Sequence, residues 1–282
     1  MENIIISDPE RLKRLKLAIS KGGAEKLHIL ADFDRTLTTA FVDGKGVHSL
    51  VSILYNENYL SPDYRKKAQA LHQKYYPIEI DPKISKEKKK KAMIEWWTKH
   101  FALLIKSGLN KNDLKDIIDS DRVRLRQGCA ELIDFLKRRN IPLVIMSASG
   151  VGIDPIAMFL EKEEKMYDNI HIISNYYEWD ENGNAVGVKE PIIHSLNKDE
   201  TAIQNFPAFE EVKSRKNVIL LGDILEDIGM VEGFDYDNLI KIGFLNEKIE
   251  ESLEGYKRKY DVVILNDSSM DYVNQLLKEI IK

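Results

Sequence analysis

Six short runs of consecutive apolar residues constrain the fold of this chain more than any other feature. They are near-continuously apolar rather than alternating, which is typical of strands covered on both faces. Amphipathic stretches such as 129–140 and 246–260 lie between most of them. We therefore predict an α/β fold with a mainly parallel sheet and right-handed crossovers. The runs are 27–31, 141–146, 170–173, 217–221, 239–243 and 261–265.

One long segment interrupts this alternation of strand and helix. Residues 41–120 carry no clear strand signal and have a polar, aromatic-rich, helix-like pattern, with helix starts indicated near Ser61 and Ser85. We interpret this segment as a helical domain inserted after the first strand. The predicted core domain then consists of residues 1–40 and 121–282.

A second interruption, residues 174–191, indicates a β-hairpin that turns at Asn182-Gly183. Its "DENGNA" stretch superficially resembles a calcium loop. Ala185 stands where that loop requires glycine, and Pro191 stands where it requires a bidentate glutamate. We therefore reject a calcium site there.

Composition narrows the classes of function. A net charge of −4 argues against a broad nucleic-acid footprint, so the Lys88–Lys91 run is interpreted as a solvated helix face. The single cysteine, Cys129, rules out an intramolecular disulfide and fits a reducing compartment. The three isoleucines at 4–6 are too few for a signal-peptide core or a membrane span. We expect a cytoplasmic monomer that binds neither nucleic acid nor membrane.

Polar residues directly after the predicted strands are the candidates for chemistry. In an open parallel sheet, ligands bind beyond the carboxyl ends of the strands. Asp32 and Asp34 follow the first run, Ser147 follows 141–146, and Asp223 and Asp227 follow 217–221. Four carboxylates gathered there would repel one another without a cation. Such a set of oxygen ligands suits Mg²⁺.

The spacing of the first pair indicates a division of labour. In an extended backbone, residues i and i+2 point the same way, so Asp32 and Asp34 face one site while Phe33 points into the protein. One carboxylate can attack an electrophile while the other handles a proton. Carboxylate nucleophiles beside Mg²⁺ are typical of phosphoryl transfer through an aspartyl-phosphate. Ser147 and the backbone N–H groups of 147–150 are candidate phosphate donors.

Longer motifs give a specific resemblance. "DFDRTLT", "MSAS", "NKDE" and "LLGDILED" follow the order of the motifs of the haloacid dehalogenase superfamily. "KYYPIEIDP", "MIEWWTKH", "IIHSLNKDE" and the stretch "IKIGFLNEKIEESLEGYKRKYDVVILND" are similar to the cytosolic pyrimidine 5′-nucleotidase family, 5′-nucleotidase III. The resemblance covers nearly the whole chain from about residue 25 onward. It implies a Rossmann-like core with a helical cap inserted after the first motif.

The resemblance also implies roles for the core residues. Asp32 would be the nucleophile, and Asp34 the general acid and base. Lys198 would neutralise the phosphate and the nucleophile. Ser147 would bind the phosphate, and Ala148 would add a backbone donor.

The family resemblance also implies the metal ligands and the residue that contacts the nucleotide base. Asp223 would bind Mg²⁺ directly, and Asp227 would be a water-mediated ligand or a support of the following helix. Asp32 and the backbone carbonyl of Asp34 would complete the metal set. Glu79, in the cap, matches the family glutamate that contacts the nucleotide base.

The chain departs from the family pattern at a few positions. Arg35 replaces the usual methionine, "SASGVGID" is one residue longer than usual, and His100 replaces a serine near the substrate. Trp96 and Trp97 are adjacent on a helix, so we expect one in the core and Trp97 at the cleft. Family members that act on 7-methylguanosine monophosphate resemble this chain at "EWWTK". A cationic purine stacked on tryptophan gains from cation–π attraction.

The sequence as a whole predicts Mg²⁺-dependent hydrolysis of nucleoside 5′-monophosphates. UMP and CMP, 7-methyl-GMP, or both are the candidate substrates, and transfer of the phosphoryl group to another nucleoside is an additional possibility. One alternative is a phosphatase for another small phosphate ester. The other is an inactive nucleotide-binding protein with the same fold, for which Arg35 is the only support.

Overall fold

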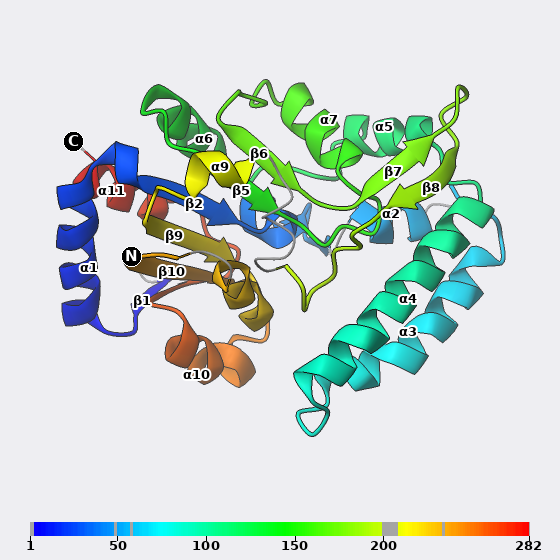
Figure 1. The fold of residues 1–282 in the computed structure, drawn as a ribbon, viewed down its shortest axis with the longest axis horizontal. Helices are drawn as coiled ribbons and strands as arrows, with labels where there is room; N and C mark the ends of the chain where they lie inside the picture. The colour runs from blue at the N-terminus through cyan, green and yellow to red at the C-terminus, as the bar shows by residue number, and fades with distance from the viewer. Residues whose placement is uncertain (1–2, 48–49, 57–58, 199–207, 233–234, 282) are drawn as a thin grey trace.

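A central β-sheet organises the computed structural model, which describes residues 3–47, 50–56, 59–198, 208–232 and 235–281. The sheet has seven strands in the order β1-β11-β10-β9-β2-β5-β6 (Figure 1). The edge strand β1 pairs antiparallel with β11, and the other neighbours pair parallel. The strands are β1 (Ile4–Ile6), β2 (Leu27–Ala31), β5 (Leu143–Met146), β6 (Ile170–Ile173), β9 (Asn217–Gly222), β10 (Asn238–Leu245) and β11 (Val262–Leu265).

All six predicted strands are confirmed, and the mainly parallel α/β class with them. The strand of the central sheet that the sequence did not predict is β1. Its three isoleucines form a run too short to separate from a loop by pattern alone. Pairing with β11 by an antiparallel ladder gives this short run its strand conformation.

Helices cover both faces of the sheet, which explains the continuous apolar runs. Successive strand residues alternate between two cores, so Ile29 and Leu30 of β2 lie in different ones. The first core is closed by α1 (Pro9–Gly22), α6 (Cys129–Arg138), α7 (Asp154–Lys162) and α11 (Asp271–Ile280). The second is closed by α9 (Ala208–Val212), η3 (Leu225–Val231) and α10 (Ile249–Lys259).

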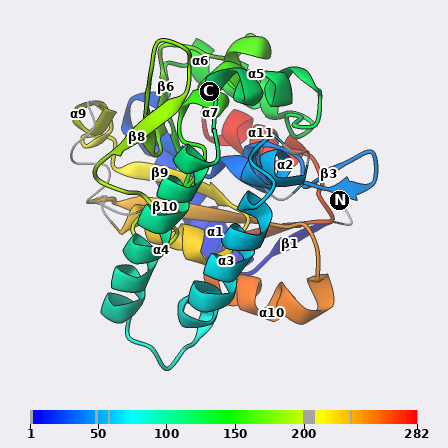
Figure 2. The same ribbon diagram turned by 90° about the vertical axis from the view of Figure 1, so that its right-hand side faces the viewer.

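The segment between β2 and α6 is mainly helical, as predicted. It contains α2 (Leu50–Asn56), α3 (Tyr64–Ile80), α4 (Lys86–Lys106) and α5 (Lys111–Asp119). Helices α3 and α4 pack side by side as an antiparallel pair that extends away from the sheet (Figures 1 and 2). The predicted helix start at Ser85 is confirmed, because its hydroxyl accepts a hydrogen bond from the N–H of Lys88 at 3.4 Å.

Two strands in this segment were not predicted. The segment opens with the tight turn η2 (Phe33–Leu37), and β3 (Phe41–Val42) and β4 (Lys45–Gly46) then form a small antiparallel hairpin. Strands of two residues have no periodicity that a sequence pattern could reveal. The domain boundaries at 41–120 stay a prediction.

The predicted hairpin at 174–191 is confirmed as β7 (Tyr176–Trp179) and β8 (Ala185–Lys189). Gly183 in its turn adopts a left-handed backbone with φ of 77°. The carboxylate of Asp180 accepts hydrogen bonds from the backbone N–H groups of Asn182 and Asn184 at 2.9 and 2.8 Å. The acidic loop therefore folds around its own backbone.

The lysine run lies on a helix at the protein surface. Lys88–Lys91 lies on α4, where Lys88 and Lys91 are exposed and Lys91 faces Glu87 one turn away. Over the part of the chain that the structure describes, no helix combines the length and apolar character needed to cross a membrane.

Candidate active site

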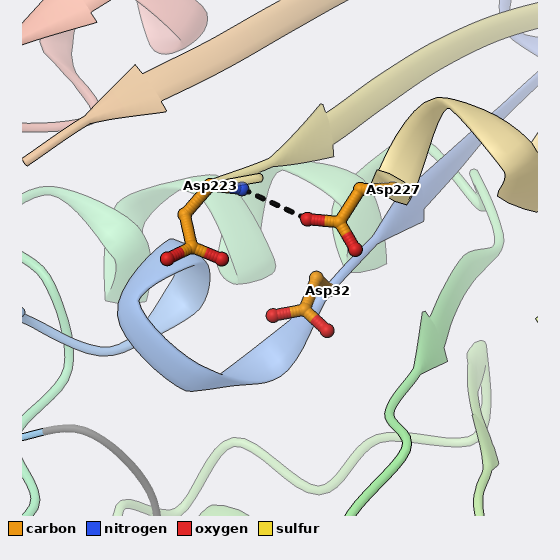
Figure 3. Close-up of side chains that lie close together, drawn as sticks. All are labelled: Asp32, Asp223 and Asp227. Carbon is orange, nitrogen blue, oxygen red and sulfur yellow. Dashed lines mark hydrogen bonds between the residues drawn. The ribbon is translucent and has the colours of Figure 1, made fainter. Parts of the chain in front are cut away.

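The parallel register brings the predicted polar residues to one edge of the sheet. Ala31 pairs with Ile145 of β5 and with Leu221 of β9. The residues that follow these strands, Asp32 and Asp223 among them, therefore emerge side by side (Figure 3). This edge is the carboxyl end of the parallel strands, where open α/β sheets bind ligands.

Three aspartates form a compact acidic cluster at this edge. One carboxylate oxygen from each of Asp32, Asp223 and Asp227 lies within 4.8 Å of the others. Asp227 is fixed in place because its Oδ2 accepts hydrogen bonds from the N–H groups of Asp223 and Ile224 at 3.0 and 3.1 Å. A Cβ on Gly222 would lie 2.5 Å from the Asp227 Cβ, so the close approach requires glycine there.

Lys198 supplies positive charge to the cluster from the opposite side. Its Nζ lies 2.5 Å from Oδ1 of Asp32 and 3.3 Å from Oδ1 of Asp227. Burial alone would lower the pKa of Lys198, but the charges of Asp32 and Asp227 raise it above its usual value. The lysine is therefore a permanent cation. The last two residues of the predicted "NKDE" motif, 199 and 200, lie outside the described residues.

The electrostatics of the cluster fit a divalent cation. Burial raises the pKa of Asp32 to about 6, with the charge of Asp227 acting in the same direction and Lys198 against it. Burial, followed by the charges of Asp227 and Asp32, raises the pKa of Asp223 well above its ordinary range. Three crowded carboxylates with oxygens in mutual reach are a donor set that Mg²⁺ accepts. The residues present therefore fit the predicted metal.

Asp34 lies in a different environment from Asp32. It sits in the tight turn η2, and its side chain lines a cavity of about 200 Å³. Burial raises the pKa of Asp34 to about 7, and the charge of Asp32 adds to the shift. A carboxyl group that titrates near neutral pH can both donate and accept a proton there. The cavity is lined by Asp34, Val51, Trp96, Trp97, His100, Ala148, Ser149 and Gly150.

Both tryptophans line this cavity, and Trp97, rather than Trp96, is the one that also packs against the hydrophobic core. Trp97 packs against Phe101, with ring centroids 5.5 Å apart. Trp96 stacks on Tyr75 of α3 at 5.9 Å and still reaches the cavity. Adjacent helical residues are 100° apart, so a cavity that spans the side of α4 can contact both. Trp97 lines the cavity beside Asp34, and its contact with a substrate stays a prediction.

His100 also lines the cavity. Its predicted contact with a substrate stays a prediction. Its Nε2 lies 2.7 Å from the hydroxyl of Tyr64 on α3. Burial lowers the pKa of His100 to about 4, so the imidazole is neutral at pH 7. The neutral ring adds no charge to the aromatic side of the cavity.

The remaining predicted ligands are divided between two places. Ala148 lines the cavity, and the adjacent Ser147 is buried directly after β5, with its N–H bonded to the carbonyl of Ile173 at 3.0 Å. Among the residues that the structure describes, Glu79 does not line the Asp34 cavity. Its carboxylate accepts a hydrogen bond from the hydroxyl of Ser195 at 2.5 Å, near Lys198. A contact of Glu79 with a nucleotide base stays a prediction.

Arg126 is a structural part of the site that the sequence did not reveal. Its side chain is fully buried and donates hydrogen bonds to the carbonyls of Thr36 and Ser268, each at 2.8 Å. It also pairs with Asp267 at 2.8 Å, and Asp267 accepts hydrogen bonds from the N–H groups of Ala40 and Phe41. These contacts hold the turn that carries Asp34. Arg126 is one of three closely spaced arginines with Arg122 and Arg124, and nothing in that pattern distinguishes it for this role.

Two solved structures have folds similar to that of this chain. A phosphoserine phosphatase, solved as an analogue of its phospho-aspartyl intermediate, matches with a TM-score of 0.53 and 17% identity, covering 91% of this chain and 98% of that one. The crystal structure of cytosolic 5′-nucleotidase IIIB bound to cytidine matches with a TM-score of 0.87 and 29% identity, covering 99% and 94%. The protein is a hydrolase of the haloacid dehalogenase superfamily.

Sequence relatives narrow this class. Residues 35–281 match the pyrimidine 5′-nucleotidase family UMPH-1, and the chain belongs to that family of 5′-nucleotidases. The human 7-methylguanosine phosphate-specific 5′-nucleotidase is 38% identical over 279 residues, which is 99% of this chain and 92% of that protein. The putative cytosolic 5′-nucleotidase 3 of Caenorhabditis elegans is 33% identical over 284 residues, covering 98% and 75%.

Proposed function

We propose that this 5′-nucleotidase hydrolyses nucleoside 5′-monophosphates in a Mg²⁺-dependent reaction through an aspartyl-phosphate on Asp32. The observation that carries the proposal is the shared cavity of Asp34, Trp96 and Trp97. The Asp34 carboxyl, which titrates near neutral pH, lies in the same hollow as two tryptophan side chains that suit a nucleotide base. The acidic cluster lies directly beside it, because Asp32 and Asp34 are two residues apart.

In the first step, a carboxylate oxygen of Asp32 attacks the phosphorus atom. The bond between phosphorus and the 5′-oxygen breaks, and Asp34 gives its proton to the departing nucleoside oxygen. Lys198, held 2.5 Å from Asp32, partly neutralises the charge of the nucleophile and of the phosphate. The products of this step are the nucleoside and phosphorylated Asp32.

In the second step, Asp34 takes a proton from a water molecule, and the resulting hydroxide attacks phosphorus. The bond to Asp32 breaks, which regenerates its carboxylate and releases inorganic phosphate. The pKa of Asp34, about 7, suits a group that donates in one step and accepts in the next. A nucleoside hydroxyl in place of water would transfer the phosphoryl group instead.

Asp32, Asp223 and Asp227, with the backbone carbonyl of Asp34, would hold the metal ion. When bound, Mg²⁺ supplies positive charge that stabilises the transferring phosphoryl group. Ser147 and the backbone of Ala148 would complete the binding of phosphate at the end of β5.

The aromatic wall supports 7-methyl-GMP as the preferred substrate, with UMP and CMP as the other candidates. Trp96 and Trp97 offer π faces, and the neutral imidazole of His100 does not repel a cationic base. The human relative is named for 7-methylguanosine phosphate, and cytosolic 5′-nucleotidase IIIB was solved with cytidine.

Residues 41–120 serve as the cap in this proposal. Closure of the cap excludes bulk water and brings Glu79 and the cap aromatics toward the base. We also propose that the protein acts in the cytoplasm as a monomer, without nucleic-acid or membrane partners.

Phosphate release from UMP, CMP, AMP, GMP and 7-methyl-GMP tests this proposal, with Mg²⁺ and with excess chelator. We expect Mg²⁺-dependent turnover with 7-methyl-GMP ahead of UMP and CMP, and little from AMP. Equal turnover of all five would remove the role given to the tryptophans. Turnover that survives the chelator would contradict the metal requirement.

A further inference from the structure

Arg35, the residue that departs from the family methionine, lies against the acidic cluster. Its backbone is left-handed, with φ of 61°. Its carbonyl accepts hydrogen bonds from Nδ2 of Asn246 at 3.0 Å and from Nη2 of Arg126. The backbone is therefore held from two sides, and this fixes the direction in which the side chain leaves the turn.

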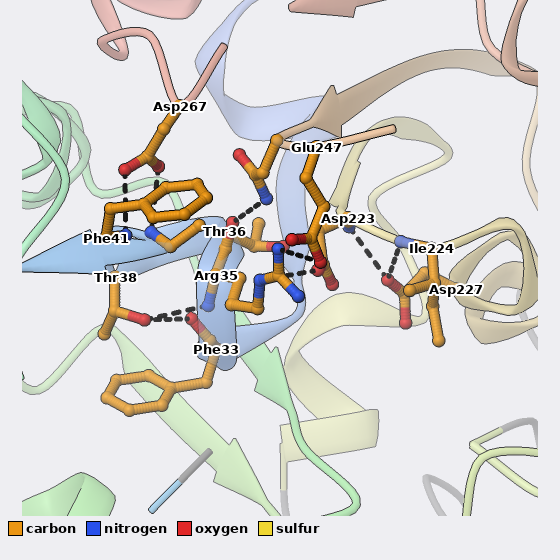
Figure 4. A network of polar contacts seen from close by, with 12 residues as sticks. Phe33, Arg35, Thr36, Thr38, Phe41, Asp223, Ile224, Asp227, Glu247 and Asp267 are labelled. Atoms are coloured by element: carbon orange, nitrogen blue, oxygen red, sulfur yellow. Dashed lines mark hydrogen bonds and ion pairs between the residues drawn. The ribbon is translucent and has the colours of Figure 1, made fainter. Parts of the chain in front are cut away.

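The guanidinium of Arg35 lies between two carboxylates (Figure 4). Nη2 lies 2.9 Å from Oε1 of Glu247, and Nε lies 3.8 Å from Oδ2 of Asp223. The side chains of Arg35 and Asp223 are 16% and 12% exposed, so water screens this pair only in part. Glu247 is 42% exposed and takes the closer contact.

Arg35 faces a different hollow from the one that Asp34 lines. This second hollow measures about 160 Å³ and is lined by Arg35, Asp223, Glu247, Lys248 and Tyr256 among others. The walls of the Asp34 cavity come from η2, α2, α4 and the loop after β5. Arg35 therefore acts on Asp223 from behind rather than from the substrate side.

Two cations thus pair with different carboxylates of the acidic cluster. Lys198 pairs with Asp32 and Asp227, whereas Arg35 pairs with Asp223. A metal ion bound by Asp223 would share that carboxylate with Arg35, and the two positive charges would repel each other. An opposite charge within about 4–6 Å changes the affinity of a carboxylate for a proton by about 1–3 pKa units. The same interaction must act on a metal ion.

We propose that Arg35 is a positioning residue that acts as the internal counter-ion of Asp223 and competes with Mg²⁺ for it. Glu247 shares the charge of Arg35 and so limits the competition. Together the two residues set the Mg²⁺ concentration at which the site fills. The inference rests on the metal site of the proposed function.

Calorimetric titration with Mg²⁺, without substrate, tests this directly. R35M removes the charge, and we expect the Kd for Mg²⁺ to fall roughly tenfold. R35N, whose short polar side chain tolerates a left-handed backbone, should tighten binding similarly. R35K keeps the charge and is the matched control, with a Kd close to that of the parent protein. Urea unfolding in chelator verifies that each variant is folded.

Glu247 provides a second, independent arm. E247Q leaves the whole charge of Arg35 facing Asp223, so Mg²⁺ should bind about threefold more weakly than to the parent. In an R35M background the same substitution should have little effect, because the charge that Glu247 shares is gone. This non-additivity separates an electrostatic role from a merely structural one.

D223N separates failure of the inference from failure of the proposed function. If the parent protein binds Mg²⁺ no better than D223N does, the proposed metal site is wrong, and the inference fails with it. If the parent binds and D223N does not, the metal site stands. In that case, equal or weaker binding by both R35M and R35N, relative to R35K, would overturn the role of Arg35.

Discussion

Asp32 and Asp34 are two residues apart, yet their surroundings differ. Lys198 lies 2.5 Å from Asp32 and partly offsets the effect of burial, so the pKa of Asp32 is about 6. Asp34 is influenced by the same lysine at longer range and by the charge of Asp32, and its pKa is about 7. The carboxylate paired with the lysine is better suited to attack as an anion, and the other to carry a proton.

The D34N variant tests this division of roles. We expect kcat for a nucleotide to fall about 10²–10⁴-fold, because the leaving nucleoside oxygen loses its proton donor. p-Nitrophenyl phosphate has a leaving group that needs no acid. D34N should therefore release about one equivalent of nitrophenolate in a burst and then stall. Absence of a burst, with parent-like steady turnover, would contradict the assignment.

At the scale of the elements, the turn after β2 depends on a buried ion pair. Asp267 pairs with the buried Arg126 and accepts hydrogen bonds from two N–H groups that follow the turn. D267A leaves the buried guanidinium without its carboxylate, which should lower the free energy of unfolding by about 3 kcal/mol. Urea denaturation measures the loss.

An exposed ion pair serves as the control for this prediction. Asp168 pairs with Lys137 but is 82% exposed. D168A should leave the free energy of unfolding close to that of the parent protein, because water screens an exposed pair. Similar losses in D267A and D168A would mean that the buried pair does not hold the turn.

His28, in the middle of β2, gives this strand a pH dependence. Burial lowers the pKa of His28 to about 4, although its Nδ1 lies 2.9 Å from the carbonyl of Arg215. In the unfolded chain, His28 takes up a proton near pH 6.5. In the folded chain it does so only near pH 4. Stability from this residue is therefore complete above pH 6.5 and is lost as the pH falls through that range.

The H28Q variant isolates this contribution. Between pH 7 and pH 5, the parent protein should lose about 2 kcal/mol more of its free energy of unfolding than H28Q does. Glutamine keeps an N–H donor but cannot take up the proton. Parallel loss in the two proteins, measured by urea denaturation at both pH values, would show that His28 titrates normally.

Strands buried on both faces were predictable because their apolar runs are continuous, as in β2 and β9. The strand-end residues Asp32, Ser147 and Asp223 followed from them, since parallel strands present their carboxyl ends at one edge. Lys198 could be assigned only through the family resemblance, because it lies outside the helices and strands and 25 residues before Asp223.

Contacts between distant segments were beyond sequence reasoning. Three placements depend on how the helices pack on the core. Glu79 lies against Ser195, Arg35 lies between Asp223 and Glu247, and Trp96 lies at the cavity. A pattern within one segment carries no information on such packing.

At the scale of the whole molecule, the linked ends of α3 and α4 contact the sheet domain. Glu79 of α3 bonds to Ser195, and Lys86 at the start of α4 pairs with Glu232 after η3. These contacts bring the linked ends of α3 and α4 near Lys198, which supports the proposed cap role of residues 41–120. A covered site excludes water and strengthens the electrostatic interactions that phosphoryl transfer needs.

In the proposed reaction, Asp32 carries the phosphoryl group during turnover. Enzyme mixed with Mg²⁺ and 7-methyl-GMP, quenched in acid and digested, can be analysed by mass spectrometry. We predict a phosphoryl group on the peptide that contains Asp32, and neither this adduct nor phosphate release in D32N. Parent-like phosphate release by D32N, or a phosphoryl group on another residue, would contradict the account.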